Sequence, residues 1–146
     1  MKNNKAFTLI EMLVVISLIG ILTALALVSF TSSQKQARDV TRKSDLKQYQ
    51  TAIENYASKN EGLYPIYAAS HTINSSTGLC ADLEIGTCPI DPKDPDYVYQ
   101  YISDALGTNY AFWATLESKV ETYWVVCSNG KSKESANVPT SGVCPI

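Results

Sequence analysis

The chain has 146 residues, a formal net charge of −2 and an isoelectric point of about 5.3. This length fits one modest domain with an appendage and excludes two independent hydrophobic cores of ordinary size. The slightly acidic balance excludes a basic surface over the whole chain, so binding to nucleic acid phosphates would need a local patch. No direct nucleic-acid site is evident in the sequence.

An apolar segment lies near the N-terminus. Residues 12–30 contain no charged side chain over nineteen positions, which is close to the ~20 residues that a helix needs to cross a bilayer. A single carboxylate, Glu11, directly precedes this run. Because an acidic side chain at membrane depth costs roughly 2.5–3.5 kcal/mol, Glu11 needs either a partner or a route to the headgroups. The alternative for the segment is a secretory signal peptide, whose apolar region is usually shorter.

A periodic pattern of apolar residues continues directly from the apolar segment. Its apolar residues recur mostly three or four positions apart, with charged residues on the other faces, which is typical of an amphipathic helix. Gly62 and Pro65 predict the end of this helix, because glycine accepts a left-handed backbone and proline cannot continue a helix. The sequence therefore predicts one helix over residues 7–59.

The remainder of the chain, from residue 62, has a different pattern. Residues 67–95 are rich in turn-forming residues and are predicted to form an irregular loop region. Strand-like segments follow at residues 96–102, 109–117 and 121–130. The predicted fold class is therefore α+β, with the long N-terminal helix packed on a small antiparallel sheet of three or four strands. The side chains expected to cover the sheet are Leu46, Tyr49, Ile53 and Tyr56.

Four cysteines, Cys80, Cys88, Cys127 and Cys144, lie downstream of the apolar segment. An even number of cysteines in that context predicts disulfides and an oxidising compartment. Four cysteines allow three connectivities; the short loops favour Cys80 with Cys88 and Cys127 with Cys144, without deciding between the three. A zinc site is disfavoured, because the sequence has no CxxC pair and its one histidine, His71, stands at no ligand spacing.

Asp91, Asp94 and Asp96 fall within six residues and form a candidate calcium site, since calcium takes oxygen ligands. The alternative is an ordinary turn, because Asp-Pro pairs are common turn formers and the spacing fits no calcium-loop consensus. No other cofactor is expected. The sequence also lacks GxSxG, HExxH and a Gly-rich phosphate loop, so the protein is not expected to be an enzyme.

The N-terminus resembles the type IV prepilin family, which includes pilins and the pseudopilins of type II secretion and competence systems. The resemblance covers about the first 30 residues: a short basic leader, the small residue Ala6, then Phe7 to Glu11 and the apolar helix. It implies that a prepilin peptidase cuts between Ala6 and Phe7 and methylates the new amine of Phe7. Ala6 departs from the family pattern, in which glycine is commonest. Gly20 matches a glycine that many pilins carry, which implies a role in assembly.

The resemblance also implies a division of the chain and a function. The function is that of a pilin, a structural subunit of a type IV pilus filament (fimbrium), in which Glu11 pairs with the Phe7 amine of a neighbouring subunit. A pair within one subunit is also within reach, because the two residues are four apart. The implied segments are a leader (1–6), a transmembrane and filament-core helix (7–30), an amphipathic helix extension (31–61) and a globular head with disulfide-bonded loops (62–146).

The implied partners are further copies of the chain, the prepilin peptidase and the inner-membrane assembly machinery. The implied location is a single-pass position in the cytoplasmic (inner) membrane, followed by an extracellular or periplasmic filament. One alternative is a major pseudopilin of a type II secretion or competence system. An alternative of another class is a monomeric, membrane-anchored extracytoplasmic binding protein, which would need neither Glu11 nor the short leader.

Overall fold

The structure is a computed structural model that describes residues 7–73 and 78–146. The predicted leader, with Ala6, therefore lies outside the described residues. The chain divides into two compact units between Lys35 and Gln36. We call residues up to Lys35 the N-terminal unit and Gln36–Ile146 the C-terminal unit.

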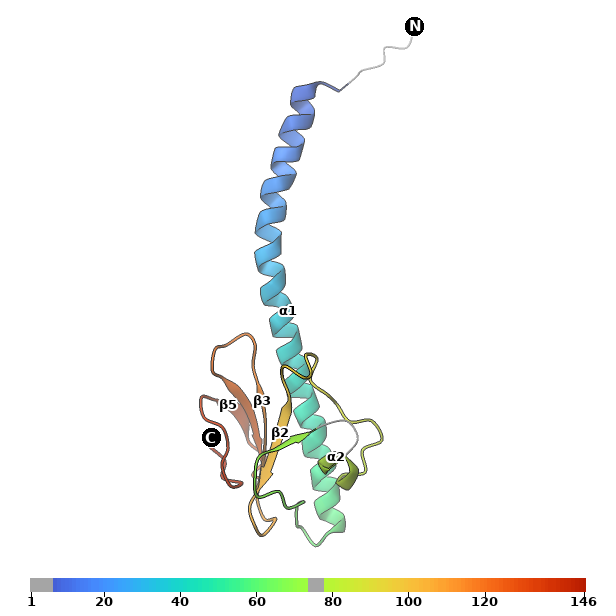
Figure 1. The fold of residues 1–146 in the computed structure, drawn as a ribbon, viewed down its shortest axis with the longest axis vertical. Helices are drawn as coiled ribbons and strands as arrows, with labels where there is room; N and C mark the ends of the chain where they lie inside the picture. The colour runs from blue at the N-terminus through green and yellow to red at the C-terminus, as the bar shows by residue number, and fades with distance from the viewer. Residues whose placement is uncertain (1–6, 74–77) are drawn as a thin grey trace. The chain divides into compact units, whose positions relative to one another are not determined.

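One long helix, α1, spans Leu9–Lys59 (Figure 1). It confirms the single helix predicted from the apolar segment and the periodic pattern that follows it. It ends just before Glu61 and Gly62, whose φ angles are 56° and 81°. The backbone N–H of Gly62 donates to the carbonyl of Ala57 at 2.9 Å, which satisfies one of the free carbonyls of the last turn. The helix therefore ends through a left-handed cap, in which Glu61 takes part as well as the predicted Gly62.

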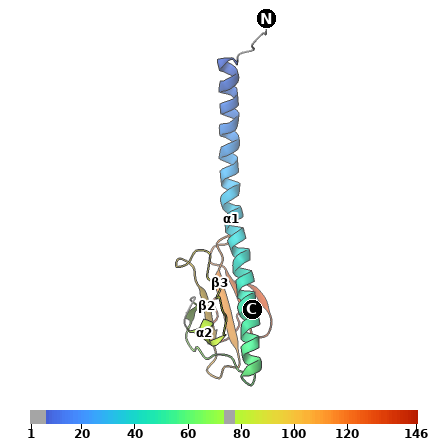
Figure 2. The same cartoon turned by 90° about the vertical axis from the view of Figure 1, so that its right-hand side faces the viewer.

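The C-terminal unit contains a five-stranded antiparallel sheet in which each strand pairs with the next along the chain, in the order β1-β2-β3-β4-β5. Figure 2 shows β2 and β3 beside the second half of α1. The elements are β1 (His71–Ile73), the short helix α2 (Leu79–Asp82), β2 (Tyr99–Ser103), β3 (Tyr110–Thr115), β4 (Tyr123–Cys127) and β5 (Ser132–Ser135).

Two strands correct the sequence-based expectation of three or four strands. The region 67–95 was predicted to be irregular, yet it contains β1, which pairs with β2 over three residues. β5 is a short polar strand that pairs with β4 at the edge of the sheet. Both strands are stabilised by backbone hydrogen bonds to a neighbouring strand. Because neither has an alternating apolar pattern, their sequences did not predict them.

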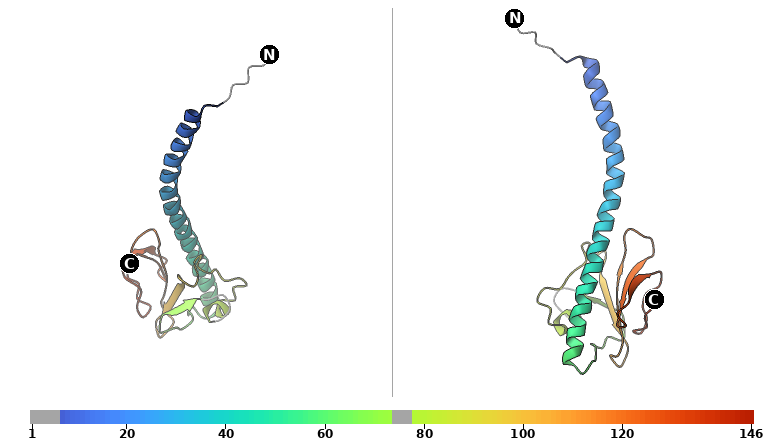
Figure 3. Two further views of the ribbon diagram at one scale, coloured as in Figure 1. Left: turned by 45° about the horizontal axis from the view of Figure 1, so that its top comes forward. Right: turned by 180° about the vertical axis from the view of Figure 1, so that it is seen from behind.

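The face of the sheet that packs against α1 contains the main core. Leu46, Tyr49 and Ile53 of α1 are fully buried there, and Tyr56 is partly buried, which confirms the predicted cover. Figure 3 shows this part of α1 lying along the sheet. The opposing side chains alternate along the strands as the pleat requires, and include Tyr99, Tyr101, Tyr110, Phe112, Ala114 and Val126.

The buried tyrosines of this core keep their hydroxyl groups hydrogen-bonded. Tyr49 donates to the carbonyl of Pro89 at 2.6 Å, and Tyr101 donates to the carbonyl of Pro65 at 2.8 Å. Tyr99 donates to Asp45 at 2.6 Å. Because a buried hydroxyl without a partner is costly, these bonds tie the loops beside the sheet to the aromatic core.

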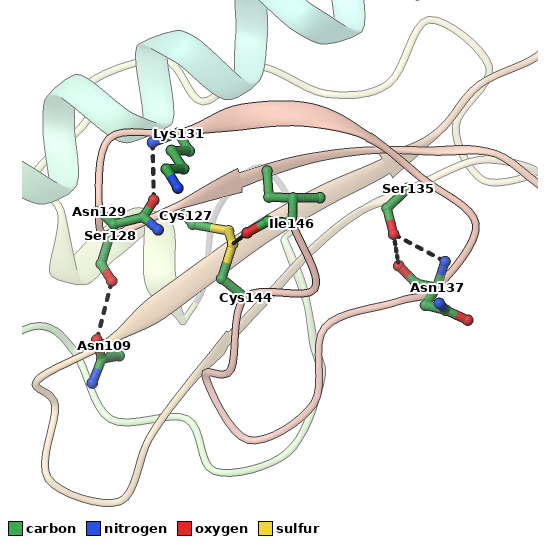
Figure 4. The surroundings of a disulfide bond; sticks show 9 residues. All are labelled: Asn109, Cys127, Ser128, Asn129, Lys131, Ser135, Asn137, Cys144 and Ile146. Carbon is green, nitrogen blue, oxygen red and sulfur yellow. Dashed lines mark hydrogen bonds between the residues drawn. A yellow bond between two sulfur atoms is a disulfide. The ribbon is translucent and has the colours of Figure 1, made fainter.

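Two disulfides hold the loops of the C-terminal unit. Cys80 is joined to Cys88, and Cys127 at the end of β4 is joined to Cys144 (Figure 4). The second bridge closes a sequence separation of 17 residues. It brings Ile146 onto the second face of the sheet, where Ile102, Trp113 and Val125 form a smaller cluster.

A buried ionic cluster joins α1 to two loops. Arg42, whose side chain is fully buried, donates two hydrogen bonds to Asp91, at 2.6 and 2.8 Å, and one to Asp39 at 2.8 Å. It also lies 2.7 Å from Glu117, which pairs as well with Arg38 at 2.7 Å and with Lys93 at 3.8 Å. Asp39 in turn accepts the backbone N–H groups of Glu117 and Ser118. The cluster, defined as Arg38, Asp39, Arg42, Asp91 and Glu117, therefore fixes the β3–β4 turn to α1.

We expect Arg42→Ala to lower the free energy of unfolding by roughly 3–5 kcal/mol, because it leaves buried carboxylates without their cation. Thermal or denaturant unfolding of the full chain in detergent, followed by near-ultraviolet circular dichroism, measures this loss. Lys59→Ala is the matched control, since it removes an exposed pair with Glu84 and is expected to change little. Equal stabilities of the Arg42→Ala variant and the wild type would contradict the assigned role.

The cluster also predicts a loss of stability in acid. Hydrogen bonding to Arg38, and then to Arg42, lowers the pKa of Glu117 from its ordinary 4.5 to about 2. A carboxyl whose pKa is lower in the folded state contributes stability above its unfolded pKa and loses it on protonation. The contribution of Glu117 to stability should therefore be complete above about pH 5 and be lost as the pH drops from 4.5 toward 2. In a pH series of unfolding curves, Glu117→Gln should reduce this fall; an unchanged profile would contradict the prediction.

Candidate assembly site at the N-terminal end of α1

The N-terminal unit exposes a continuous apolar surface. From Leu9 to Leu25 its large hydrophobic side chains are between 46% and 84% exposed. Among the described residues, α1 is also the helix that is long and apolar enough to span a membrane, by length and composition. An apolar surface of this extent marks a site for lipid or for other protein surfaces.

The polar side chains within this surface are satisfied by the helix itself. Ser17 donates to the carbonyl of Leu13 and Thr23 to that of Ile19, both at 2.8 Å. In a medium without water, such bonds remove the cost of an unpaired hydroxyl. The helix can therefore present this surface to lipid or to other helices without exposing an unpaired hydroxyl at these two positions.

Glu11 forms a reciprocal cap with Thr8 at the start of α1. The backbone N–H and the hydroxyl of Thr8 both donate to Glu11 Oε2, at 2.8 and 2.7 Å. The backbone N–H of Glu11 returns a bond to the hydroxyl of Thr8 at 3.3 Å. This is the capping-box arrangement, in which two residues satisfy N–H groups that the helix leaves free. The carboxylate of Glu11 is thus held at the N-terminal end of the helix.

The structure places Thr8, rather than Phe7, against Glu11. Phe7 is exposed just before the helix, and it is still bonded to Ala6, so the amine that the predicted pair needs does not exist in this uncleaved chain. Thr8 was missed as a site residue. A Thr followed three positions later by Glu, in front of an apolar run, is the sequence signal that identifies it.

Gly20 lies inside α1 with its missing side chain facing open space. A Cβ built there would meet no atom within 4 Å. No contact within the described chain therefore requires a glycine at this position. The absence of a side chain lowers the local stability of the helix and leaves room for another helix to approach closely.

The three candidate calcium ligands do not converge. Asp91 is buried and bound by Arg42, and the backbone N–H of Lys93 donates to it at 2.9 Å. Asp94 and Asp96 are exposed. Within residues 7–73 and 78–146, no three His, Cys, Asp or Glu side chains lie together as a metal site requires. Calcium binding stays a prediction without support from this geometry.

Comparison with known proteins adds to the N-terminal geometry. Residues 1–27 match the family model described as the prokaryotic N-terminal methylation motif. The chain is 36% identical over 59 residues to the type IV major pilin protein PilA of Myxococcus xanthus, covering 40% of this chain and 27% of that protein. It is 37% identical over 84 residues to the type IV wide pilus major component PilA4 of Thermus thermophilus, covering 58% of each.

The matched regions span between about a quarter and three fifths of the length of these relatives. No solved structure matches the chain closely enough to be compared. The protein belongs to the α+β class. Its long N-terminal helix begins with an apolar half, and the second half of this helix packs on an antiparallel sheet. More particularly, its first 27 residues match the prokaryotic N-terminal methylation motif, and the described residues form an α+β architecture.

The cap predicts that Thr8→Ala loosens the first turn of α1 while Thr8→Ser does not, because serine keeps a hydroxyl that can accept from the N–H of Glu11. Hydrogen exchange of the full chain in detergent measures the effect at residues 9–11, where we expect about fivefold faster exchange in Thr8→Ala. Identical exchange in the two variants would show that the hydroxyl of Thr8 does not stabilise the helix start.

Proposed function

We propose that this protein is a pilin, a structural subunit of a type IV pilus filament that assembles through the N-terminal half of α1. The observation that supports it best is the exposed apolar surface from Leu9 to Leu25, which lies within the methylation motif. Both similar proteins are described as major pilus components, which favours a pilin over a pseudopilin. The role is structural rather than catalytic.

The subunit first resides in the cytoplasmic membrane as a single-pass protein. Its apolar surface from Leu9 to Leu25 contacts lipid there, and α1 has the length and composition of a membrane span. A prepilin peptidase removes residues 1–6 and methylates the new amine of Phe7. The inner-membrane assembly machinery then transfers the subunit to an extracellular or periplasmic filament.

The cap at the start of α1 suggests how Glu11 serves assembly. Its carboxylate is already held beside the backbone N–H of Thr8, one residue from the amine that cleavage creates at Phe7. The amine is cationic and the carboxylate anionic, so the start of each helix carries both members of an ion pair. In the filament, Glu11 pairs with the Phe7 amine of a neighbouring subunit, which sets the stagger between the two helices.

Packing then drives the assembly. Helices that leave the bilayer exchange lipid contacts for contacts with each other, and their backbone groups are already satisfied internally. A head-to-tail contact that is repeated without closing on itself gives an open helical filament. The side chains between Leu9 and Leu25 supply the surface that each new subunit buries.

Glu11→Ala tests this proposal in the native host. We expect normal membrane insertion and peptidase cleavage, with filament yield below about a tenth of wild type, because an amine buried without its carboxylate is costly. Filaments sheared from cells are quantified against the membrane-bound subunit. Asp96→Ala is the matched control, since Asp96 is an exposed carboxylate far along the chain from this helix start.

Glu11→Gln separates charge from capping. Glutamine keeps the hydrogen bonds of a capping box but carries no charge. We expect it to restore the order of the first helical turn and still to block assembly. Wild-type filament yield from Glu11→Gln would show that the cap, and not the ion pair, is what assembly requires.

A further inference from the structure

The turn between β4 and β5 contains Asn129, the one asparagine in the sequence that is followed by a glycine, Gly130. Both residues are exposed. Gly130 has a φ of 79°, a left-handed backbone conformation that glycine adopts without strain. Apart from its chain neighbours, no described atom lies within 4 Å of the position that a Cβ on Gly130 would take. The space beside Gly130 is therefore open to a moving side chain and to water.

An asparagine in this context can lose its side-chain amide. The backbone nitrogen of Gly130 attacks Cγ of Asn129, because residue 130 has no side chain to hinder the approach. The N–Cγ bond forms and the Cγ–Nδ2 bond breaks, and ammonia leaves with the proton that the Gly130 nitrogen gives up. Water then opens the resulting succinimide ring at either of its carbonyl carbons. The product is aspartate or isoaspartate, and no oxidant or reductant takes part.

The folded turn keeps both reacting groups engaged. The N–H of Gly130 donates to the carbonyl of Cys127 at 3.0 Å. Oδ1 of Asn129 accepts the backbone N–H of Lys131 at 2.9 Å, as Figure 4 shows, which is the arrangement of an Asx turn. For the attack, the Gly130 nitrogen has to release its proton and the Asn129 side chain has to rotate. Both hydrogen bonds therefore have to break first, so the reaction proceeds from an opened turn.

The turn lies in a part of the sheet that can open locally. It leads into β5, an edge strand that pairs with β4 alone among the described strands and carries no buried side chain. Exposed segments of this kind open at a much lower free energy than the whole domain. Cys127, in contrast, is fully buried and bridged to Cys144. Opening is therefore confined to the residues after Cys127 and does not require unfolding of the C-terminal unit.

We infer that Asn129 is the site at which the folded protein undergoes spontaneous deamidation, at a rate set by the opening of the β4–β5 turn. Either product introduces a carboxylate next to the Cys127–Cys144 loop. Isoaspartate also inserts an extra methylene into the main chain between residues 129 and 130, which is incompatible with the bonds that close the turn. The pairing of β5 with β4 is then lost. The inference concerns the C-terminal unit alone and is independent of the proposed filament function.

Incubation of the full chain in detergent, in a mildly alkaline buffer, tests the site. Peptide mapping by mass spectrometry measures, at each asparagine, the mass gained when the amide NH₂ is replaced by OH. We expect Asn129 to convert first, with isoaspartate as the main product. Asn137 is the matched control within the same molecule, since it is also exposed but is followed by the β-branched Val138. Conversion of Asn129 that is no faster than that of Asn137 overturns the inference.

The same measurement in denaturant tests whether the turn sets the rate. We expect Asn129 to convert about tenfold faster in the unfolded chain, because folding adds two hydrogen bonds of ordinary strength that have to break before the attack. Equal rates in the folded and unfolded chain overturn the role of the turn.

Hydrogen exchange of the isoaspartate-containing fraction tests the structural consequence. We expect severalfold faster exchange at the N–H groups of β5 that pair with β4, and unchanged exchange in β3, which lies inside the sheet. Exchange in β5 that matches the unmodified protein overturns the proposed loss of pairing.

Discussion

The two halves of α1 require different surroundings, and the rest of the structure depends on this constraint. Over its first half, α1 is apolar on every face, and its side chains from Leu9 to Leu25 remain exposed. Over its second half it is amphipathic, and Leu46, Tyr49 and Ile53 are fully buried against the sheet. A helix that is apolar all round requires lipid or protein around it, whereas an amphipathic helix requires one covered face. The C-terminal unit covers the amphipathic half of α1, and in the proposed filament neighbouring subunits would cover the apolar half.

The C-terminal unit achieves its cover with charges as well as with apolar packing. Arg42 lies on α1 and binds carboxylates from its own helix, from the loop before β2 and from the β3–β4 turn. Such a cluster gives little net stability compared with an apolar replacement, but losing one member is costly. Its effect is therefore to fix the β3–β4 turn to α1 in one arrangement.

The start of α1 uses a carboxylate in a similar way. Glu11 accepts two hydrogen bonds from Thr8 of the same chain, so its carboxylate is hydrogen-bonded at the start of the helix. In the proposed maturation, cleavage would add an amine at Phe7, and the same carboxylate would then have a partner of opposite charge. In this proposal, the Glu11 carboxylate is hydrogen-bonded to Thr8 before assembly and pairs with the Phe7 amine during assembly. This exchange of partners would offset the cost of an acidic side chain beside a membrane span.

The sequence predicted those features that repeat locally and missed those that depend on distant residues. The helix and its buried face follow from periodicity, so the cover by Leu46, Tyr49 and Ile53 was predicted correctly. β1 was missed because its three residues are stabilised by their pairing with β2 and not by their own pattern. The cluster around Arg42 was missed because only Asp39 and Arg42 lie one helical turn apart, whereas positions 91 and 117 are distant in the sequence. Thr8 was overlooked although its spacing from Glu11 was visible.

The most direct test is the intact mass and N-terminal sequence of the protein isolated from filaments of its native host. The proposed pilin should begin at a methylated Phe7 and should lack four hydrogens relative to the thiol form, since Cys80–Cys88 and Cys127–Cys144 are both bridged. A chain that begins at Met1, or that is cut after the apolar segment, would contradict assembly through the N-terminal helix and would leave a tethered or secreted protein.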